Sequence, residues 1–157
     1  MKLGVAAILL AVVFMVSGCA AATNPASHVM TPKQAAADYL RIVRPLNKAV
    51  DNEDAAGDDS WAEFQYYATG TRGAFLIADT SLGSPKSWPA RIRGDVSAIK
   101  TELNDWAGAL QKVANAPASI NPETFSFQPS RVEQARGAKA VADLRMWLGL
   151  GPDGGGY

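Results

Sequence analysis

The sequence predicts an all-α fold, an antiparallel four-helix bundle, and three observations lead to this prediction. Apolar residues recur with helical spacing in four segments of the chain. Residues that start helices precede these segments, and stretches rich in Pro and Gly separate them. Alternating strand patterns are lacking, apart from a few residues around Phe125. Amphipathic helices joined in this way favour an up-down bundle. The alternative is a three-helix core with the N-terminal helix splayed along it.

The most regular of these segments is 92–113, in which apolar residues alternate four and three positions apart. These residues are Ile92, Val96, Ile99, Leu103, Trp106, Leu110 and Val113. Such a seven-residue repeat places one straight apolar seam on a helix, and the seam needs partner helices. We expect the charged residues between the seam positions to be solvated: Arg93, Asp95, Lys100, Glu102, Asp105 and Lys112.

The first helix of the domain is expected to begin at Thr31-Pro32, a capping hydroxyl followed by Pro at the first helical position. Its apolar stripe continues to Val50. Pro45 lies inside the stripe and removes a backbone donor, so it either kinks or splits the helix, and a kink keeps the stripe in phase. The acidic stretch 51–59 is expected to be a loop, and its spacing does not match a calcium-binding loop.

The second helix begins at Ser60, with Glu63 three residues on, a capping box. Its apolar seam is Trp61, Phe64, Ala68, Thr71, Phe75, Ala78 and Leu82. A second face carries Tyr66, Gly70, Gly73 and Ile77. Glycine destabilises a helix, so two of them on one face suggest either close packing of another helix or a ligand groove beside Tyr66. Close packing is the simpler interpretation, and this face is also the candidate binding face.

The last helix is expected to begin at Ser130, which forms a second capping box with Glu133, and to end at Gly149. Arg131, Arg136, Lys139, Asp143 and Arg145 are expected to face solvent. The segment 115–129 before it contains three prolines and no helical stripe. Phe125 and Phe127 give this segment apolar groups to bury, so we expect it to cross the bundle.

The first residues of the chain have the pattern of an export signal. Lys2 precedes an apolar run, residues 3–16, that is too short for a comfortable membrane span. The run ends in Val16-Ser17-Gly18-Cys19, which resembles the lipobox of bacterial lipoproteins. This resemblance implies cleavage after Gly18 and a lipid on Cys19. The expected organisation is a signal peptide at 1–18, a tether at 19–30, a helical domain at 31–150 and a disordered tail at 151–157. The alternatives are a secreted protein with a chance cysteine, or an uncleaved anchor helix.

Composition limits the partners of the chain. Cys19 is the only cysteine, so no disulfide forms, and the thiol at this position has a use in lipid attachment. Lys plus Arg number 15 and Asp plus Glu number 15, so no basic surplus exists to neutralise phosphates. Nucleic acid is therefore not an expected partner. The expected partners are the membrane, reached through Cys19, and an envelope protein or small ligand.

The sequence offers no catalytic constellation. Its single histidine, His28, lies in the tether, and no motif for a nucleophile, a phosphate loop or a metal site is present. We therefore expect no enzyme activity, no metal and no cofactor. The expected function is a non-catalytic binding module at the cell envelope.

The chain as a whole resembles the small uncharacterised lipoproteins of actinobacteria and their phages. The resemblance lies in the lipobox, in Tyr39 with Pro45-Leu46-Asn47, and in the ending from Leu144 to Pro152. Many such proteins end in Leu-Gly-Leu-Pro-Pro, from which Gly151-Pro152 departs. The resemblance implies a protein on the extracytoplasmic face of the cell membrane. It adds two alternatives for function, a phage-encoded lipoprotein that excludes a second phage and a structural envelope protein, and it implies no catalytic residue.

Overall fold

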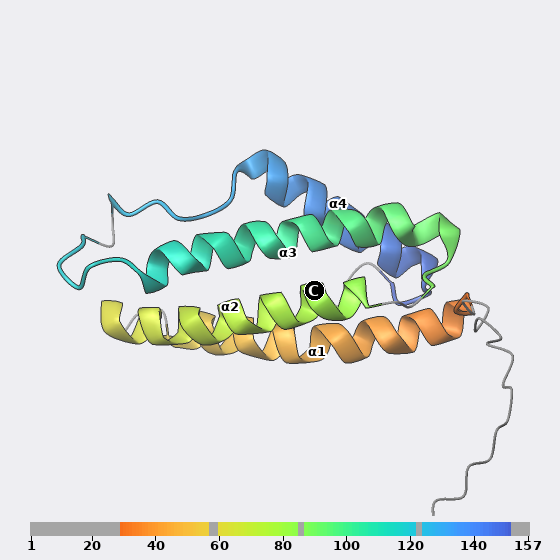
Figure 1. The fold of residues 1–157 in the computed structure, drawn as a ribbon, viewed down its shortest axis with the longest axis horizontal. Coiled ribbons are helices and arrows are strands. Elements are labelled where there is room, and N and C mark those ends of the chain that lie inside the picture. The colour runs from red at the N-terminus through yellow and green to blue at the C-terminus, as the bar shows by residue number, and fades with distance from the viewer. Residues whose placement is uncertain (1–28, 57–59, 85–86, 122–123, 152–157) are drawn as a thin grey trace, which may run out of the picture.

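The computed structural model describes residues 29–56, 60–84, 87–121 and 124–151. These residues form helices α1 (Pro32–Ala56), α2 (Trp61–Gly83), α3 (Arg93–Ala114) and α4 (Arg131–Trp147), with a short 3-10 helix, η1 (Ala90–Ile92), leading into α3. Successive α-helices run in opposite directions along the long axis (Figure 1). The predicted all-α, four-helix fold is confirmed. None of the helices in these ranges is both long and apolar enough to cross a membrane.

The four helices pack in sequence order, with α1 against α2, α2 against α3 and α3 against α4. The alternative with a splayed first helix is not observed, because Tyr39 and Leu46 of α1 are fully buried in the core. α1 continues through Pro45, so the proline does not split it. α4 is the shortest of the four and lies over the part of α3 nearer its N-terminus (Figure 1).

The α3 seam forms the centre of the core. Six of its seven apolar residues are buried, and Trp106 is half-buried with its ring stacked on Phe75 of α2. The α2 seam is buried from Ala68 to Leu82. Burying an apolar side chain of this size contributes roughly 1.5–3 kcal/mol relative to leaving it exposed. The two seams identified in the sequence therefore provide most of the contact between the central pair of helices.

The helix ends follow the expected capping chemistry. Ser130 and Glu133 form a reciprocal capping box at the start of α4, and the Ser60 hydroxyl accepts a hydrogen bond from the Glu63 N–H at the start of α2. At the end of α4, Gly149 has a φ of 72°, and its N–H bonds the Met146 carbonyl. The Leu150 N–H bonds the Arg145 carbonyl. This is the Schellman pattern, in which a left-handed glycine satisfies the last carbonyls of a helix.

Residues 115–121 and 124–130 complete the end of the bundle that α4 does not reach. As expected, Phe125 and Phe127 are partly buried and pack on the core. The Phe125 ring meets Trp61 edge-on with centroids 5.5 Å apart, and Phe127 lies against Phe64. The Gln65 side-chain amide donates to the carbonyls of Val113 and Ala116, at 2.9 and 2.7 Å. These contacts hold the loop after α3 against α2.

Three expectations about solvated segments are wrong. α1 extends to Ala56, so residues 51–56 of the expected acidic loop are helical. No Pro or Gly interrupts the chain between Pro45 and Gly57, which allows the helix to continue. Glu102 and Arg145 are buried rather than solvated. Glu102 fits against Gly137 of α4, and the Arg145 side chain turns back to the carbonyls that follow its own helix.

The chain enters the domain at one end of the bundle, which we call the tether end. Val29 pairs with Ser87 in an isolated bridge, and the Met30 N–H donates to the Ser87 carbonyl at 3.0 Å. The last two residues of the expected tether therefore contact the domain. The buried Trp88 indole donates to the Leu82 carbonyl at 3.0 Å, which fixes the connection between α2 and α3 at this end.

Candidate functional site

The expected lipid-attachment residues, Val16, Ser17, Gly18 and Cys19, lie outside the residues that the structure describes. Lipid attachment at Cys19 therefore stays a prediction. The residues of the domain offer two further candidate surfaces, one on α2 and one between α3 and α4.

The first surface is the α2 face, made of Tyr66, Gly70, Gly73 and Ile77. Tyr66 is 74% exposed and Ile77 is 67% exposed. In the part of the chain that the structure describes, no heavy atom lies within 4 Å of a Cβ added at Gly70 or Gly73. The expectation that another helix packs closely on these glycines is therefore wrong, because α1 and α3 contact α2 on its other sides.

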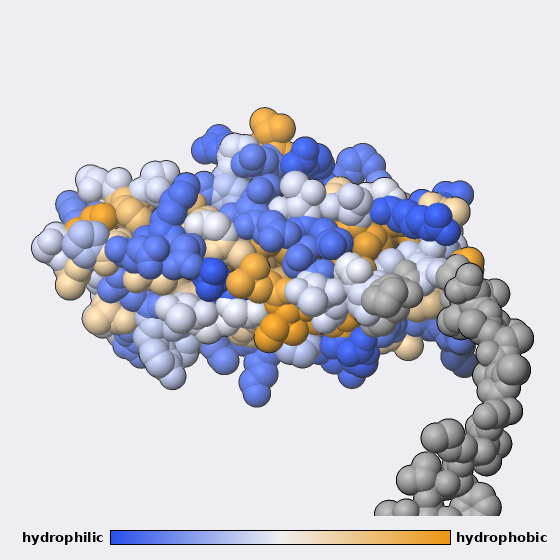
Figure 2. All heavy atoms as spheres, in the orientation of Figure 1, coloured by the Kyte–Doolittle hydropathy of each residue, from blue (hydrophilic) through white to orange (hydrophobic). Residues whose placement is uncertain are grey.

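The α2 face is an open surface with aromatic and aliphatic groups at its two ends. Tyr66 meets the neighbouring Tyr67 edge-on, with ring centroids 5.4 Å apart. Figure 2 shows hydrophobic residues gathered over the middle of α2 on an otherwise largely hydrophilic side of the molecule. The glycines expose helix backbone between them. Such a surface has chemistry suited to binding an apolar partner.

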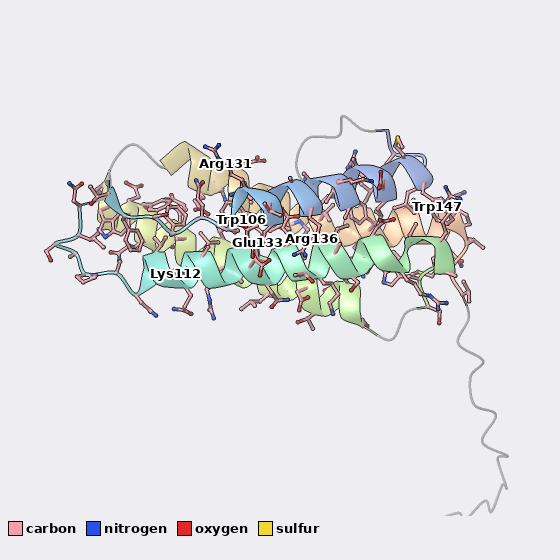
Figure 3. The ribbon with its side chains drawn as sticks, turned by 90° about the horizontal axis from the view of Figure 1, so that it is seen from above. Trp106, Lys112, Arg131, Glu133, Arg136 and Trp147 are labelled. Atoms are coloured by element: carbon pink, nitrogen blue, oxygen red, sulfur yellow. The ribbon has the colours of Figure 1, made fainter. Side chains whose placement is uncertain are left out.

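The second surface is a cleft of about 600 Å³ between η1 and the start of α3 on one side and the end of α4 on the other. We call it the tether-end cleft, and it is lined by Arg91, Ile92, Asp95, Asp143, Met146 and Trp147. Antiparallel packing brings these segments together, since the start of α3 lies beside the end of α4. Figure 3 shows Trp147 at this end of the molecule and Arg131 toward the opposite end of α4.

Opposite charges meet in the tether-end cleft. Burial raises the pKa of the Asp95 carboxyl, and the nearby charge of Asp143 raises it further, while Lys139 and Arg91 lower it. Lys139 is ion-paired to Asp143 on the outside of α4. The hydrogen bond to Asp143 raises the pKa of the Lys139 ammonium. The cleft therefore holds two carboxylates that repel each other, with one cationic side chain near each.

The titratable groups that line the cleft are Asp95, Asp143 and Arg91. Its lining contains two carboxylates but no Ser, Thr, Cys or His that could act as a nucleophile or shuttle protons at neutral pH. Within the described ranges, no group of three or more His, Cys, Asp or Glu side chains converges as a metal site would require.

A buried polar pair lies near the cleft. The Tyr39 hydroxyl of α1 is buried and makes no hydrogen bond of good geometry within the described residues, although the Arg145 guanidinium lies beside it. Burial raises the pKa of Tyr39 more than the charge of Arg145 lowers it. Arg145 donates to the carbonyls of Gly151 and Leu150, at 3.1 and 3.4 Å. This arrangement ties the residues after α4 to the core.

The tether-end cleft was not predicted from the sequence. Asp95 and Asp143 were expected on solvated faces because of their charge alone, and Met146 and Arg91 had no expected role in a site. Two signals were present: Arg91 and Asp95 are four residues apart, as are Asp143 and Trp147, so each pair shares a helix face. The last two helices were predicted to be antiparallel, so the start of one lies beside the end of the other. That order could have placed these two pairs opposite each other.

Comparison with known proteins adds no family: no protein-family model, curated protein or solved structure matches the chain.

Proposed function

We propose that the protein is a lipoprotein of the extracytoplasmic membrane face, anchored through acylated Cys19, whose helical bundle is a non-catalytic binding module at the cell envelope. The signal-like N-terminus and the Val16-Ser17-Gly18-Cys19 motif support the anchor. The absence of a membrane-crossing helix among the described residues is compatible with attachment by lipid. Two or three acyl chains bind a membrane firmly, since each buried CH₂ contributes about 0.8 kcal/mol.

One observation carries the binding-module part of the proposal, the exposure of Tyr66 and Ile77 on α2. Large side chains on a central helix of a bundle are ordinarily buried, and here both lie on the same uncovered face. Tyr is enriched at protein interfaces because it combines apolar area with a hydroxyl. The partner of the α2 face is therefore expected to present an apolar surface with a hydrogen-bonding group.

Photo-crosslinking in intact cells tests this proposal. A benzophenone-bearing phenylalanine analogue replaces Tyr66 in one variant and Val132 in a control variant. Val132 is 79% exposed but lies on α4, away from the α2 face. We expect a discrete crosslinked adduct from position 66 and none from position 132. Equal labelling patterns at the two positions, or no adduct at either, would contradict a binding role for the α2 face.

A further inference from the structure

The tether-end cleft lies beside the point where the chain enters the domain. Val29 and Met30 contact Ser87, and four residues after Ser87 the chain reaches Arg91, which lines the cleft. The start of α1, the start of α3 and the end of α4 lie at the same end of the bundle (Figure 1). The cleft is lined from the last two of these segments, so it shares this end with the entry point. Any surface to which the N-terminus is attached is nearest to this end.

The reach of the tether limits how far this end lies from a membrane. Ten peptide units join Cys19 to Val29. A fully extended chain of this length spans at most about 35 Å. This step rests on the proposed function, because it requires a lipid at Cys19. Given that lipid, the tether end stays close enough to contact the headgroup layer.

Exposed apolar groups accompany the charges at the tether end. Met146 is 62% exposed and lines the cleft, and Val29 is 48% exposed at the entry point. Trp147 is half-buried and lines the cleft as well. Aromatic and apolar side chains next to charged ones are typical of surfaces that rest in the membrane interface.

The charges of the cleft fit a zwitterion better than a simple ion. Asp95 and Asp143 carry two negative charges, and Arg91 and Lys139 balance them. A ligand with an ammonium group would relieve the repulsion between the two carboxylates, and a phosphate on the same ligand would match the guanidinium of Arg91. The volume of about 600 Å³ lies within the roughly 300–1,000 Å³ range of small-molecule sites, so a headgroup fits.

We propose that the tether end docks on the anchoring bilayer and that its cleft binds a phosphoethanolamine headgroup. Asp95 and Asp143 accept hydrogen bonds from the primary ammonium, and Arg91 donates to the phosphate. The exposed Lys139–Asp143 pair is easily exchanged for this ammonium, because surface ion pairs contribute little to stability. A choline headgroup has no N–H to donate, so the site discriminates against it.

Titration calorimetry tests headgroup binding directly. Glycerophosphoethanolamine is titrated into the purified mature protein, which is kept in solution by an uncharged maltoside detergent. We expect one-to-one binding that is at least tenfold weaker in Asp95→Asn and in Arg91→Gln. Asp105→Asn, which removes a carboxylate of α3 outside this cleft, should bind as the wild type does. Absence of binding, equal binding of glycerophosphocholine, or wild-type binding by Asp95→Asn would overturn the proposal.

Fluorescence quenching on vesicles tests docking. Acylation consumes the Cys19 thiol, so Met146→Cys carries the single thiol available for a fluorophore. Val132→Cys places the same fluorophore at the other end of α4. On vesicles of phosphatidylethanolamine and phosphatidylglycerol, a water-soluble quencher should reach position 132 at least threefold more effectively than position 146. Equal quenching at the two positions would overturn docking.

The two experiments separate failure of docking from failure of the anchor. Protein without a lipid does not sediment with the vesicles, which shows that the anchor is missing. Headgroup binding is then tested by calorimetry alone, because the calorimetric experiment does not require a lipid anchor. Protein that sediments but shows equal quenching is anchored and does not dock.

Discussion

The carboxylate of Glu102 on α3 occupies the space that a side chain at Gly137 on α4 would fill. Both residues are buried where the two helices meet. The absence of a side chain at Gly137 lets the carboxyl group of Glu102 enter the α3–α4 interface. The position of α4, and with it the second wall of the tether-end cleft, therefore depends on this pair.

Gly137→Ala should destabilise the protein. The added Cβ overlaps the Glu102 carboxylate, so Glu102 or α4 must move. Overpacking of a core typically costs about 1–3 kcal/mol. Alanine gains roughly 1 kcal/mol over glycine in a helix, so the expected net loss is up to about 2 kcal/mol. We expect a lower free energy of unfolding in urea, followed by circular dichroism. A variant as stable as the wild type would show that Glu102 leaves the interface without cost.

Gly70→Ala should have the opposite effect and serves as the matched control. Gly70 also lies inside a helix, but a Cβ there has open space. Alanine reduces the backbone entropy of the unfolded chain, so the free energy of unfolding should rise by about 0.5–1 kcal/mol. The same urea titration measures it. A destabilised variant would mean that the α2 face is covered in solution, for instance by another copy of the chain.

Tyr39 should make the protein sensitive to alkali. Burial raises its pKa above the ordinary value of 10.0, so between these two pKa values the folded state keeps a proton that the unfolded state has lost. Stability that is present below pH 10 is therefore lost as the pH rises, by at most about 1.4 kcal/mol per pH unit for this one group. Urea unfolding from about pH 8 to pH 11 measures the loss. Tyr39→Phe should have a shallower decline, and identical slopes would contradict this role for Tyr39.

Glu133 should make the protein sensitive to acid. Its interactions with the Ser130 hydroxyl and backbone N–H lower the pKa of the carboxyl below its ordinary 4.5. The unfolded state therefore takes up a proton first as the pH falls below that value, and the folded state loses stability. We expect a shallower loss in Glu133→Gln when unfolding is measured from about pH 6 to pH 3.

Ser130→Ala provides the control for the Glu133 prediction. This substitution removes the Ser130 hydroxyl that interacts with Glu133. The free energy of unfolding should therefore also decrease less steeply as the pH falls. Loss of a helix N-cap should in addition cost about 1 kcal/mol at neutral pH. If Ser130→Ala keeps the full acid dependence of the wild type, the capping box is not its source.

Local rules were enough to predict the helices. The seven-residue repeat in α3 and the capping residues Ser60 and Ser130 depend only on neighbours within a few positions, so the sequence contains them in full. Gly149 was placed correctly for the same reason. The end of α1 was not, because the acidic residues after Val50 suggested a loop although no residue there breaks a helix.

Tertiary contacts account for the features that local sequence patterns did not predict. The charge of Glu102 and of Arg145 suggests a surface position in the sequence. In the structure the Glu102 carboxyl lies against Gly137, and the Arg145 guanidinium donates to a carbonyl after α4, so both side chains are buried. Gly70 and Gly73 were expected to meet a helix, but among the described residues nothing lies within 4 Å of a Cβ added at either position. The tether-end cleft required knowing which helix ends meet, and that follows from topology rather than from any single stretch.

Intact-mass spectrometry of the protein from the membrane fraction, for the wild type and for Cys19→Ala, decides whether Cys19 is acylated. We expect a wild-type mass equal to residues 19–157 plus two or three acyl chains, and a Cys19→Ala protein that carries no lipid. A wild-type protein without acyl chains would contradict the anchor, and with it the proposed location at the envelope.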